Sequence, residues 1–316
     1  LLMILSHMLI SFEEAAQALN NQDIVAIPTE TVYGLAARID SEKALKKIFA
    51  TKKRPFFDPL IVHISNLEMA KSLVLHWPMA ATKLAQAFWP GPLTIILPKN
   101  SLLVSDLITS GLPNVGLRMP KHEITLKLIE KIQTPLAAPS ANLFGKTSPT
   151  NAQHVESEFD QKIATLDGGS CQVGIESTIV YLDESQLAFN ILRPGMISKE
   201  EILEIIPNYT FQNKLETSSP GDLPFHYQPT IPLFLIPEIL SSKDRKLIQS
   251  DRIAFLKLSE YPDIAARELY SMLRQYSSDS SFDAIALEYF NAIKDVPAWQ
   301  AIVNRLTKAG RLLENK

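Results

Sequence analysis

The chain has 316 residues, of which 46% are hydrophobic and 21% charged, so it can bury a substantial core and is not a disordered protein. Its formal net charge of −3 excludes a global attraction to nucleic acid or to an anionic membrane, and any anion site must therefore be local. The single cysteine, Cys171, excludes an internal disulfide and a cysteine-based zinc site, and it suits a reducing cytosol.

No apolar run approaches the roughly 20 residues that are needed to cross a bilayer. The first ten residues are apolar, but they lack the basic region and the cleavage site of a signal peptide. We therefore expect a soluble, cytoplasmic protein with no membrane partner.

Helices and strands alternate along the first 205 residues, but not in strict βαβ order, which predicts a mixed sheet. A capping box at Ser11–Glu14 opens the first helix, and Thr150 is expected to cap a later one. The other predicted helices cover 41–50, 67–75, 79–88 and 121–131. The predicted strands cover 24–27, 60–64, 93–97, 115–118, 136–139, 164–167, 177–181 and 188–193.

The composition changes at 208–230, where a Pro- and Ser-containing stretch with little periodicity predicts a linker or crossing loop. A small α/β unit follows, with strands expected at 231–236, 252–256 and 284–288 and helices at 264–276 and 299–309. The expected division is therefore a first domain over 1–207, a linker over 208–230 and a second domain over 231–316.

The sequence contains neither a G-x-x-x-x-G-K-[ST] loop nor a G-x-G-x-x-G turn, so side chains must supply most of the charge at any phosphate site. Four places could do so, because each sets polar or cationic residues at the end of a helix or strand. A single arginine at the end of a strand is usually a surface ion pair, but four such places together favour convergence on one anionic ligand. They are Lys52-x-Arg54, Arg118, Ser140-x-Asn142 (with Lys146 and Ser148 behind it) and Arg193.

The segment 27–35 places two threonines, a glutamate and a glycine directly after a predicted buried strand, where α/β proteins tend to bind ligands. The alternative is an ordinary strand-to-helix turn with Thr29 or Thr31 as the helix N-cap. His63 alternates with apolar residues on a strand, so it is either a core histidine or a functional one. Nothing in the spacing pairs Glu30 with Glu176 as an acid and base.

Eight of these segments resemble the motifs of the YrdC-type L-threonylcarbamoyladenylate synthases and occur in the family's order over about residues 12–205. The segments are 28–35, 52–55, 59–63, 89–94, 116–120, 138–142, 176–180 and 192–195. Pro220-Gly221 and His226-Tyr227-x-Pro229 look like the linker of the longer, two-domain subgroup. The resemblance implies an α/β fold: a twisted mixed sheet with helices around a concave cavity, then a small Rossmann-like domain.

The resemblance also implies an activity, that of a nucleotidyltransferase. Such an enzyme forms threonylcarbamoyl-AMP and diphosphate from L-threonine, bicarbonate and ATP. Mg²⁺ would arrive with the nucleotide and not in a protein-held metal site. The product would pass to a separate transferase complex that modifies adenosine 37 of ANN-decoding tRNAs, and direct tRNA binding is not required.

The family's functional positions fall on thirteen residues of this chain. The catalytic tetrad falls on Lys52, Arg54, Ser140 and Asn142. The threonine-binding positions fall on Thr31, His63, Arg118, Ala138 and Ser177. The ATP-binding positions fall on the tetrad and on Asp58, Ser148, Arg193 and Tyr227, the last in a linker expected to act as a lid. Asp58 stands where many members have Asn, and a carboxylate near phosphate is repulsive without a metal.

Two other classes of protein remain as alternatives. An RNA-binding module would use a concave basic face of the same fold, which the acidic net charge disfavours. A carbamoyl-transfer domain of hydrogenase maturation would need an acylphosphatase-like region and Cys-rich zinc motifs, and this chain has neither.

Overall fold

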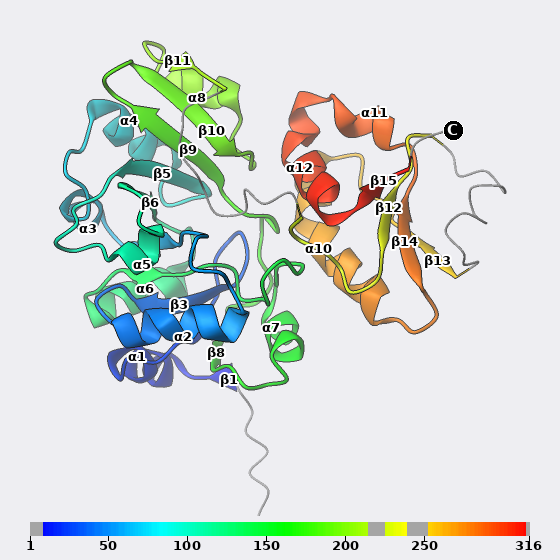
Figure 1. The fold of residues 1–316 in the computed structure, drawn as a ribbon, viewed down its shortest axis with the longest axis horizontal. Coiled ribbons are helices and arrows are strands. Elements are labelled where there is room, and N and C mark those ends of the chain that lie inside the picture. The colour runs from blue at the N-terminus through cyan, green and yellow to red at the C-terminus, as the bar shows by residue number, and fades with distance from the viewer. Residues whose placement is uncertain (1–8, 214–224, 239–251, 314–316) are drawn as a thin grey trace, which may run out of the picture.

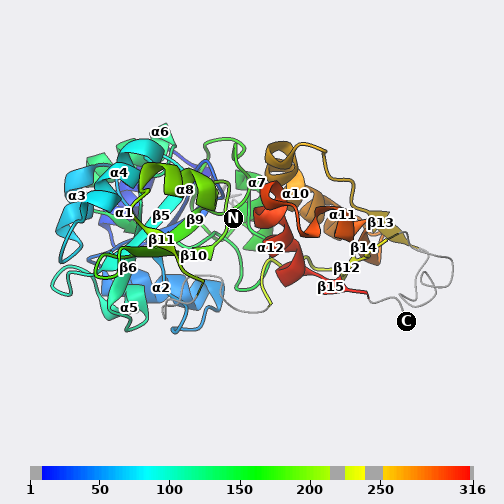
Figure 2. The ribbon, with the colours of Figure 1, turned by 90° about the horizontal axis from the view of Figure 1, so that it is seen from above.

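The computed structural model describes residues 9–213, 225–238 and 252–313, which form two units, each built on its own sheet (Figure 1). Pro220 and Gly221 of the expected linker motif lie outside the described residues. In the described part of the chain, no helix is long and apolar enough to cross a membrane. Seen from above, the two units lie next to each other along the long axis of the molecule (Figure 2).

The first unit contains an eleven-stranded mixed sheet, as the sequence predicts. Strands β4 and β6 pair in parallel, whereas β6 and β5 pair antiparallel. The spatial order is β1 (Leu9–Ile10), β8 (Thr165–Leu166), β2 (Val25–Ile27), β3 (Gly34–Arg38), β7 (Leu136–Ala137), β4 (Ile61–His63), β6 (Asn114–Arg118), β5 (Leu93–Pro98), β9 (Thr178–Asp183), β10 (Ala188–Arg193) and β11 (Thr210–Phe211).

Helices cover both faces of this sheet, because successive side chains of a strand point to opposite faces and apolar side chains therefore have to be buried on both. On β2, Val25 and Ile27 point to a core shared with α1 and α6, whereas Ala26 points to a core shared with α2 and α4. The helices of this unit are α1 (Phe12–Asn20), α2 (Glu42–Lys52), α3 (Leu67–Ser72), α4 (Met79–Phe88), α5 (Asp106–Thr109), α6 (Glu123–Ile132), α7 (Ala152–Glu158) and α8 (Lys199–Ile205).

The structure corrects three local predictions. Ser11 and Glu14 do form the capping box of α1, but the N-cap of α7 is Asn151 and not Thr150. The strand β3 was not predicted, and it is the extended segment that follows the first motif. The alternative in which Thr29 or Thr31 is a helix N-cap is therefore wrong, because no helix starts there.

The second unit is a four-stranded sheet in which all pairings are parallel, with the order β13 (Ile253–Phe255), β14 (Ala284–Leu287), β12 (Leu233–Leu235) and β15 (Arg311–Leu312). Its helices are α10 (Pro262–Ser278), α11 (Phe290–Lys294) and α12 (Gln300–Ala309), preceded by the 3₁₀ turn η1 (Pro297–Trp299). A small parallel sheet with covering helices agrees with the expected Rossmann-like architecture.

Helices α10 and α12 face the first unit (Figure 1). Val32 and Ile175 of the first unit belong to the same buried cluster as Leu269 and Leu306 of the second. Gly174 has a φ of +81°, and a Cβ built there would lie 2.3 Å from the Cα of Arg267 on α10. Glycine is therefore required where the two backbones meet.

Candidate active site

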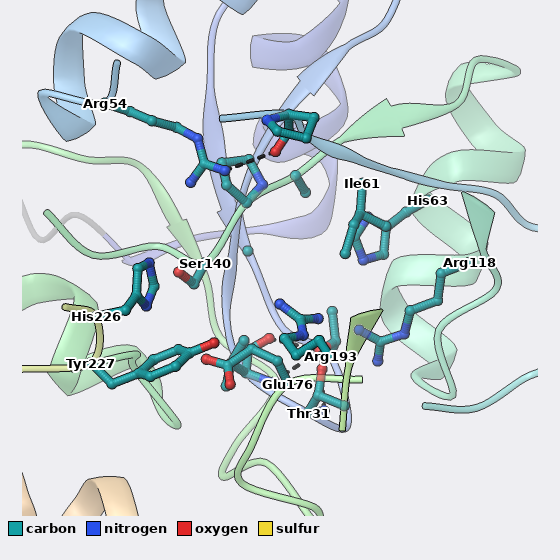
Figure 3. Close-up of a pocket in the computed structure, with 16 residues that line it drawn as sticks. Thr31, Arg54, Ile61, His63, Arg118, Ser140, Glu176, Arg193, His226 and Tyr227 are labelled. Carbon is teal, nitrogen blue, oxygen red and sulfur yellow. Dashed lines mark hydrogen bonds between the residues drawn. The ribbon is translucent and has the colours of Figure 1, made fainter. Parts of the chain in front are cut away.

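A pocket lies where the ends of several strands of the first unit meet the segment that carries His226 and Tyr227 (Figure 3). The figure shows His63 and Arg118 on one side, Tyr227 and His226 on the opposite side, and Arg193 and Ser140 between them. The sixteen lining residues are Thr29, Thr31, Val32, Gly34, Arg54, Pro59, Ile61, His63, Arg118, Ala138, Pro139, Ser140, Glu176, Arg193, His226 and Tyr227.

The cavity itself holds only about 50 Å³. Pockets for drug-sized ligands measure roughly 300–1,000 Å³, so side chains fill most of the space between the walls. Tyr227 lines the cavity, is itself buried, and has a left-handed backbone at a φ of 63°.

The first motif forms a turn that its own hydroxyl group holds together. The backbone N–H groups of Thr31 and Val32 donate to Oγ1 of Thr29 at 3.2 Å each, and that hydroxyl donates to the carbonyl of Val32 at 2.7 Å. The buried Thr31 is thereby fixed at the pocket wall. The sequence motif predicts a ligand-binding segment here, but it does not reveal this bonding.

Arg54 lines the pocket, and its backbone neighbours orient it. Its Nε donates to the carbonyl of Asp58 at 3.1 Å, and its Nη2 donates to the carbonyl of Pro59 at 2.8 Å. The same Nη2 lies 2.9 Å from Oδ2 of Asp58. Asp58 does not line the pocket, and its carboxylate acts instead as the counter-charge of Arg54.

Lys52 and Asn142 lie behind the pocket wall. The buried Nζ of Lys52 donates to the carbonyls of Ser140 and Asn142, at 2.5 Å in each case. Burial, followed by the charge of Arg54, holds the pKa of Lys52 well below its usual range. The amide of Asn142 donates to the carbonyls of Leu143 and Lys146. These two side chains hold the loop that presents Ser140 to the pocket.

His63 and Arg118 are register partners on the adjacent strands β4 and β6, and Ala138 lies nearby on the same wall. Burial, assisted by the charge of Arg118, lowers the pKa of His63 to about 3, so the imidazole is neutral. Nη2 of Arg118 lies 2.8 Å from Oε2 of the buried Glu30, and its Nε donates to the carbonyl of Gly91 at 3.3 Å. A further N–H group of the guanidinium fork remains for a ligand carboxylate.

Two of the expected serines support the wall without lining it. Ser177 receives hydrogen bonds from Arg193, at 3.1 Å to its carbonyl and 3.1 Å to its hydroxyl. The hydroxyl of Ser148 donates to Oε1 of Glu176 at 2.6 Å. Of the thirteen expected residues, eight line the pocket, and Lys52, Asp58, Asn142, Ser148 and Ser177 lie behind it.

Of the lining residues that were not among the expected site residues, two are ionisable, Glu176 and His226. Glu176 directly precedes the expected Ser177, and His226 directly precedes Tyr227, so both stood within recognised motifs. Burial lowers the pKa of His226 to about 3, although the charge of Glu176 opposes this. In residues 9–213, 225–238 and 252–313, no group of three or more His, Cys, Asp or Glu side chains is arranged to hold a metal ion.

Two protein-family models match consecutive parts of this chain. A family model of the Sua5/YciO/YrdC type, described as "Telomere recombination", matches residues 17–195. A second model, described as "Threonylcarbamoyl-AMP synthase, C-terminal domain", matches residues 197–310.

Two curated relatives are threonylcarbamoyl-AMP synthases. The one from Pyrococcus abyssi is 36% identical over 93% of this chain and 92% of its own, and the one from Bacillus subtilis is 37% identical over 95% of this chain and 93% of its own. The crystal structure of P. abyssi Sua5 complexed with L-threonine superposes with a TM-score of 0.84 and 36% identity, covering 96% of each chain.

Proposed function

The chain belongs to the Sua5/YciO/YrdC family in its two-domain form, and from that premise we propose that it is a threonylcarbamoyl-AMP synthase. The reaction joins L-threonine, bicarbonate and ATP into threonylcarbamoyl-AMP, with release of water when the carbamate forms and of diphosphate when it attacks ATP. The relatives that match over more than nine tenths of both chains carry this name, and a solved relative is complexed with L-threonine.

The observation that carries the proposal is the meeting of two sets of side chains in one pocket. Thr31, His63 and Arg118 stand on the side that would take threonine, with Arg118 as the clamp for its carboxylate. Arg54, Ser140 and Arg193 would face the phosphates of ATP. These six residues are separated by up to 162 positions in the sequence, and nothing in local structure alone requires them to converge.

The chemistry explains why such a set suffices. Carbamoylation of the threonine amine creates a carbamate, whose oxygen must then attack the α-phosphorus of ATP. Negative charge gathers in both steps, so positioning and fixed cations should supply most of the rate, and no covalent enzyme intermediate is needed. The neutral His63 can accept or donate a hydrogen bond without adding charge.

Further parts of the proposal follow from the family. Mg²⁺ would be bound by the nucleotide phosphates, and bicarbonate would enter beside the threonine amine. The product would go to a tRNA threonylcarbamoyl transferase complex in the cytoplasm, with no requirement for direct tRNA binding. We propose residues 1–207 as the catalytic domain, 208–230 as a linker that acts as a lid through Tyr227, and 231–316 as the second domain.

The test is substrate-dependent release of diphosphate by the purified full chain. We expect release from ATP only when both threonine and bicarbonate are present, together with threonylcarbamoyl-AMP as a product detected by mass spectrometry. Equal release without threonine, or in buffer freed of carbon dioxide, would contradict the proposal. Arg54→Met serves as the inactive control, since loss of one charged donor costs about 2.7–4 kcal/mol of barrier.

A further inference from the structure

The three arginines that line the pocket differ in the acids that they face. Arg54 is paired with Asp58, and Arg118 is paired with Glu30. Within the described part of the chain, no carboxylate forms an ion pair with Arg193, whose fork donates to the carbonyl and hydroxyl of Ser177. Its charge is therefore the one least compensated by the protein and the most available to an anion.

Glu176 is the acid that could compensate Arg193, because both line the same pocket and the charge of Arg193 acts on the carboxylate. The carboxylate is turned instead toward the second unit. Nε of Arg305 donates to its Oε2 at 3.0 Å, and the hydroxyl of Tyr270 donates to the same oxygen at 3.0 Å. The hydroxyl of Ser148 binds the other oxygen.

Arg305 touches three pocket-forming segments at once. Besides the carboxylate, its Nη2 donates to the backbone carbonyl of Glu176 at 3.1 Å, and its Nη1 donates to the carbonyl of Pro194, next to Arg193. Its guanidinium carbon lies 5.5 Å from the centre of the Tyr227 ring. The side chain is fully buried on α12, so a residue of the second unit completes the charge pattern of a pocket in the first.

The buried carboxylate of Glu176 requires Arg305 as its cationic partner. Burial by itself raises the pKa of Glu176, but Arg305 and Arg193 together hold it at about 2, so the group is a carboxylate at neutral pH. A buried carboxylate without a cation is strongly unfavourable. If Arg305 were absent, Arg193 would be the remaining cation for Glu176, and its charge would no longer serve an anionic ligand.

We propose that Arg305 is a positioning residue of the active site: it neutralises Glu176 from the second domain and thereby keeps Arg193 free for the anionic substrate. The inference rests on the proposed function in taking that substrate to be ATP. It assigns the second domain a direct part in nucleotide affinity.

The experiment uses the full chain and measures ATP affinity in the presence of Mg²⁺ by titration calorimetry, together with KM for ATP and kcat. Arg305→Met keeps the length of the side chain but removes its charge, and we expect ATP to bind at least about tenfold more weakly. The double variant Arg305→Met/Glu176→Gln removes the uncompensated carboxylate as well, and we expect it to recover most of that loss. Arg311→Met, at an exposed arginine of the same domain, is the matched control and should bind ATP as the wild type does.

A purely structural role for Arg305 predicts that the loss and its recovery appear in the free energy of unfolding and not in the ATP affinity of the folded protein. No recovery of ATP affinity in the double variant would overturn the inference. Unchanged ATP affinity in Arg305→Met would do the same. If Arg305→Met does not fold, the double variant alone tests the inference, which then requires this variant to fold and to bind ATP within a few fold of the wild type. Wild-type protein that binds ATP but shows no threonine-dependent turnover would refute the proposed function, yet it would leave the comparison of affinities intact.

Discussion

Replacing Arg118 by methionine tests whether this arginine has a structural role as well as a binding one. The side chains of Arg118 and Glu30 are 5% and 3% exposed, and Nη2 and Oε2 lie 2.8 Å apart. Arg118→Met would leave a buried carboxylate without its cation. Breaking a buried pair in this way costs about 3–5 kcal/mol of unfolding free energy, which corresponds to a melting temperature lower by roughly 6–20 °C.

The matched measurement is thermal and urea unfolding of three variants. Arg118→Met should show the full loss, and Arg118→Met/Glu30→Gln should recover much of it because the stranded charge is gone. Arg38→Met removes an arginine from the partly exposed pair with Asp40, also closed at 2.7 Å, and should cost no more than about 1 kcal/mol. If Arg118→Met melts within about 2 °C of Arg38→Met, the reasoning from burial is refuted.

Three further predictions concern stability and its dependence on pH. Burial lowers the pKa of His63 and His226 to about 3 from the ordinary 6.5, so the free energy of unfolding that they contribute is fully present above pH 6.5 and is lost as pH falls from 6.5 toward 3. Urea midpoints should therefore drop over this pH range. His63→Asn should make this dependence of the urea midpoint on pH less steep, whereas the exposed His76→Asn should not. Lys52→Met leaves two loop carbonyls without their donor and should cost about 1–3 kcal/mol in urea unfolding and weaken ATP binding, while Met at the neighbouring exposed Lys53 should change neither. Gly174→Ala combines a left-handed φ with a clash against α10, so it should destabilise the fold more than Gly169→Ala. Gly169 has a similar φ of +78°, but no atom lies within 4 Å of the added Cβ. Equal urea midpoints of the two variants would contradict the close contact between the domains.

The polar motifs make the candidate pocket predictable to a useful degree. Arg54, Ser140 and Arg193 each lie at or just beyond the end of a helix or strand, and the number of such polar ends favours convergence on one ligand without requiring it. The long periodic helices and the apolar strands were predicted within a few residues, because hydrophobic periodicity reports directly which face is buried.

Features that depend on tertiary contacts were beyond this reasoning. Gly34–Arg38 consists mostly of small residues with low β-propensity, and it is a strand because β2 and β7 both pair with it. The contact of Arg305 with Glu176 spans 129 positions and depends on how the two domains dock. In the same way, the pairing of Arg118 with Glu30 follows from the fold and not from the spacing of charges in the sequence.

The position of Arg305 on α12 also has a consequence for synthesis on the ribosome. Domains generally fold as units during translation, the N-terminal one first. The residues of the eleven-stranded sheet will therefore have left the ribosome before α12 has been synthesised. In this nascent chain Glu176 has no guanidinium partner from the second domain. The half-made protein should bind nucleotide poorly, so a ribosome-bound chain would acquire its affinity for ATP only when α12 has been released and docked.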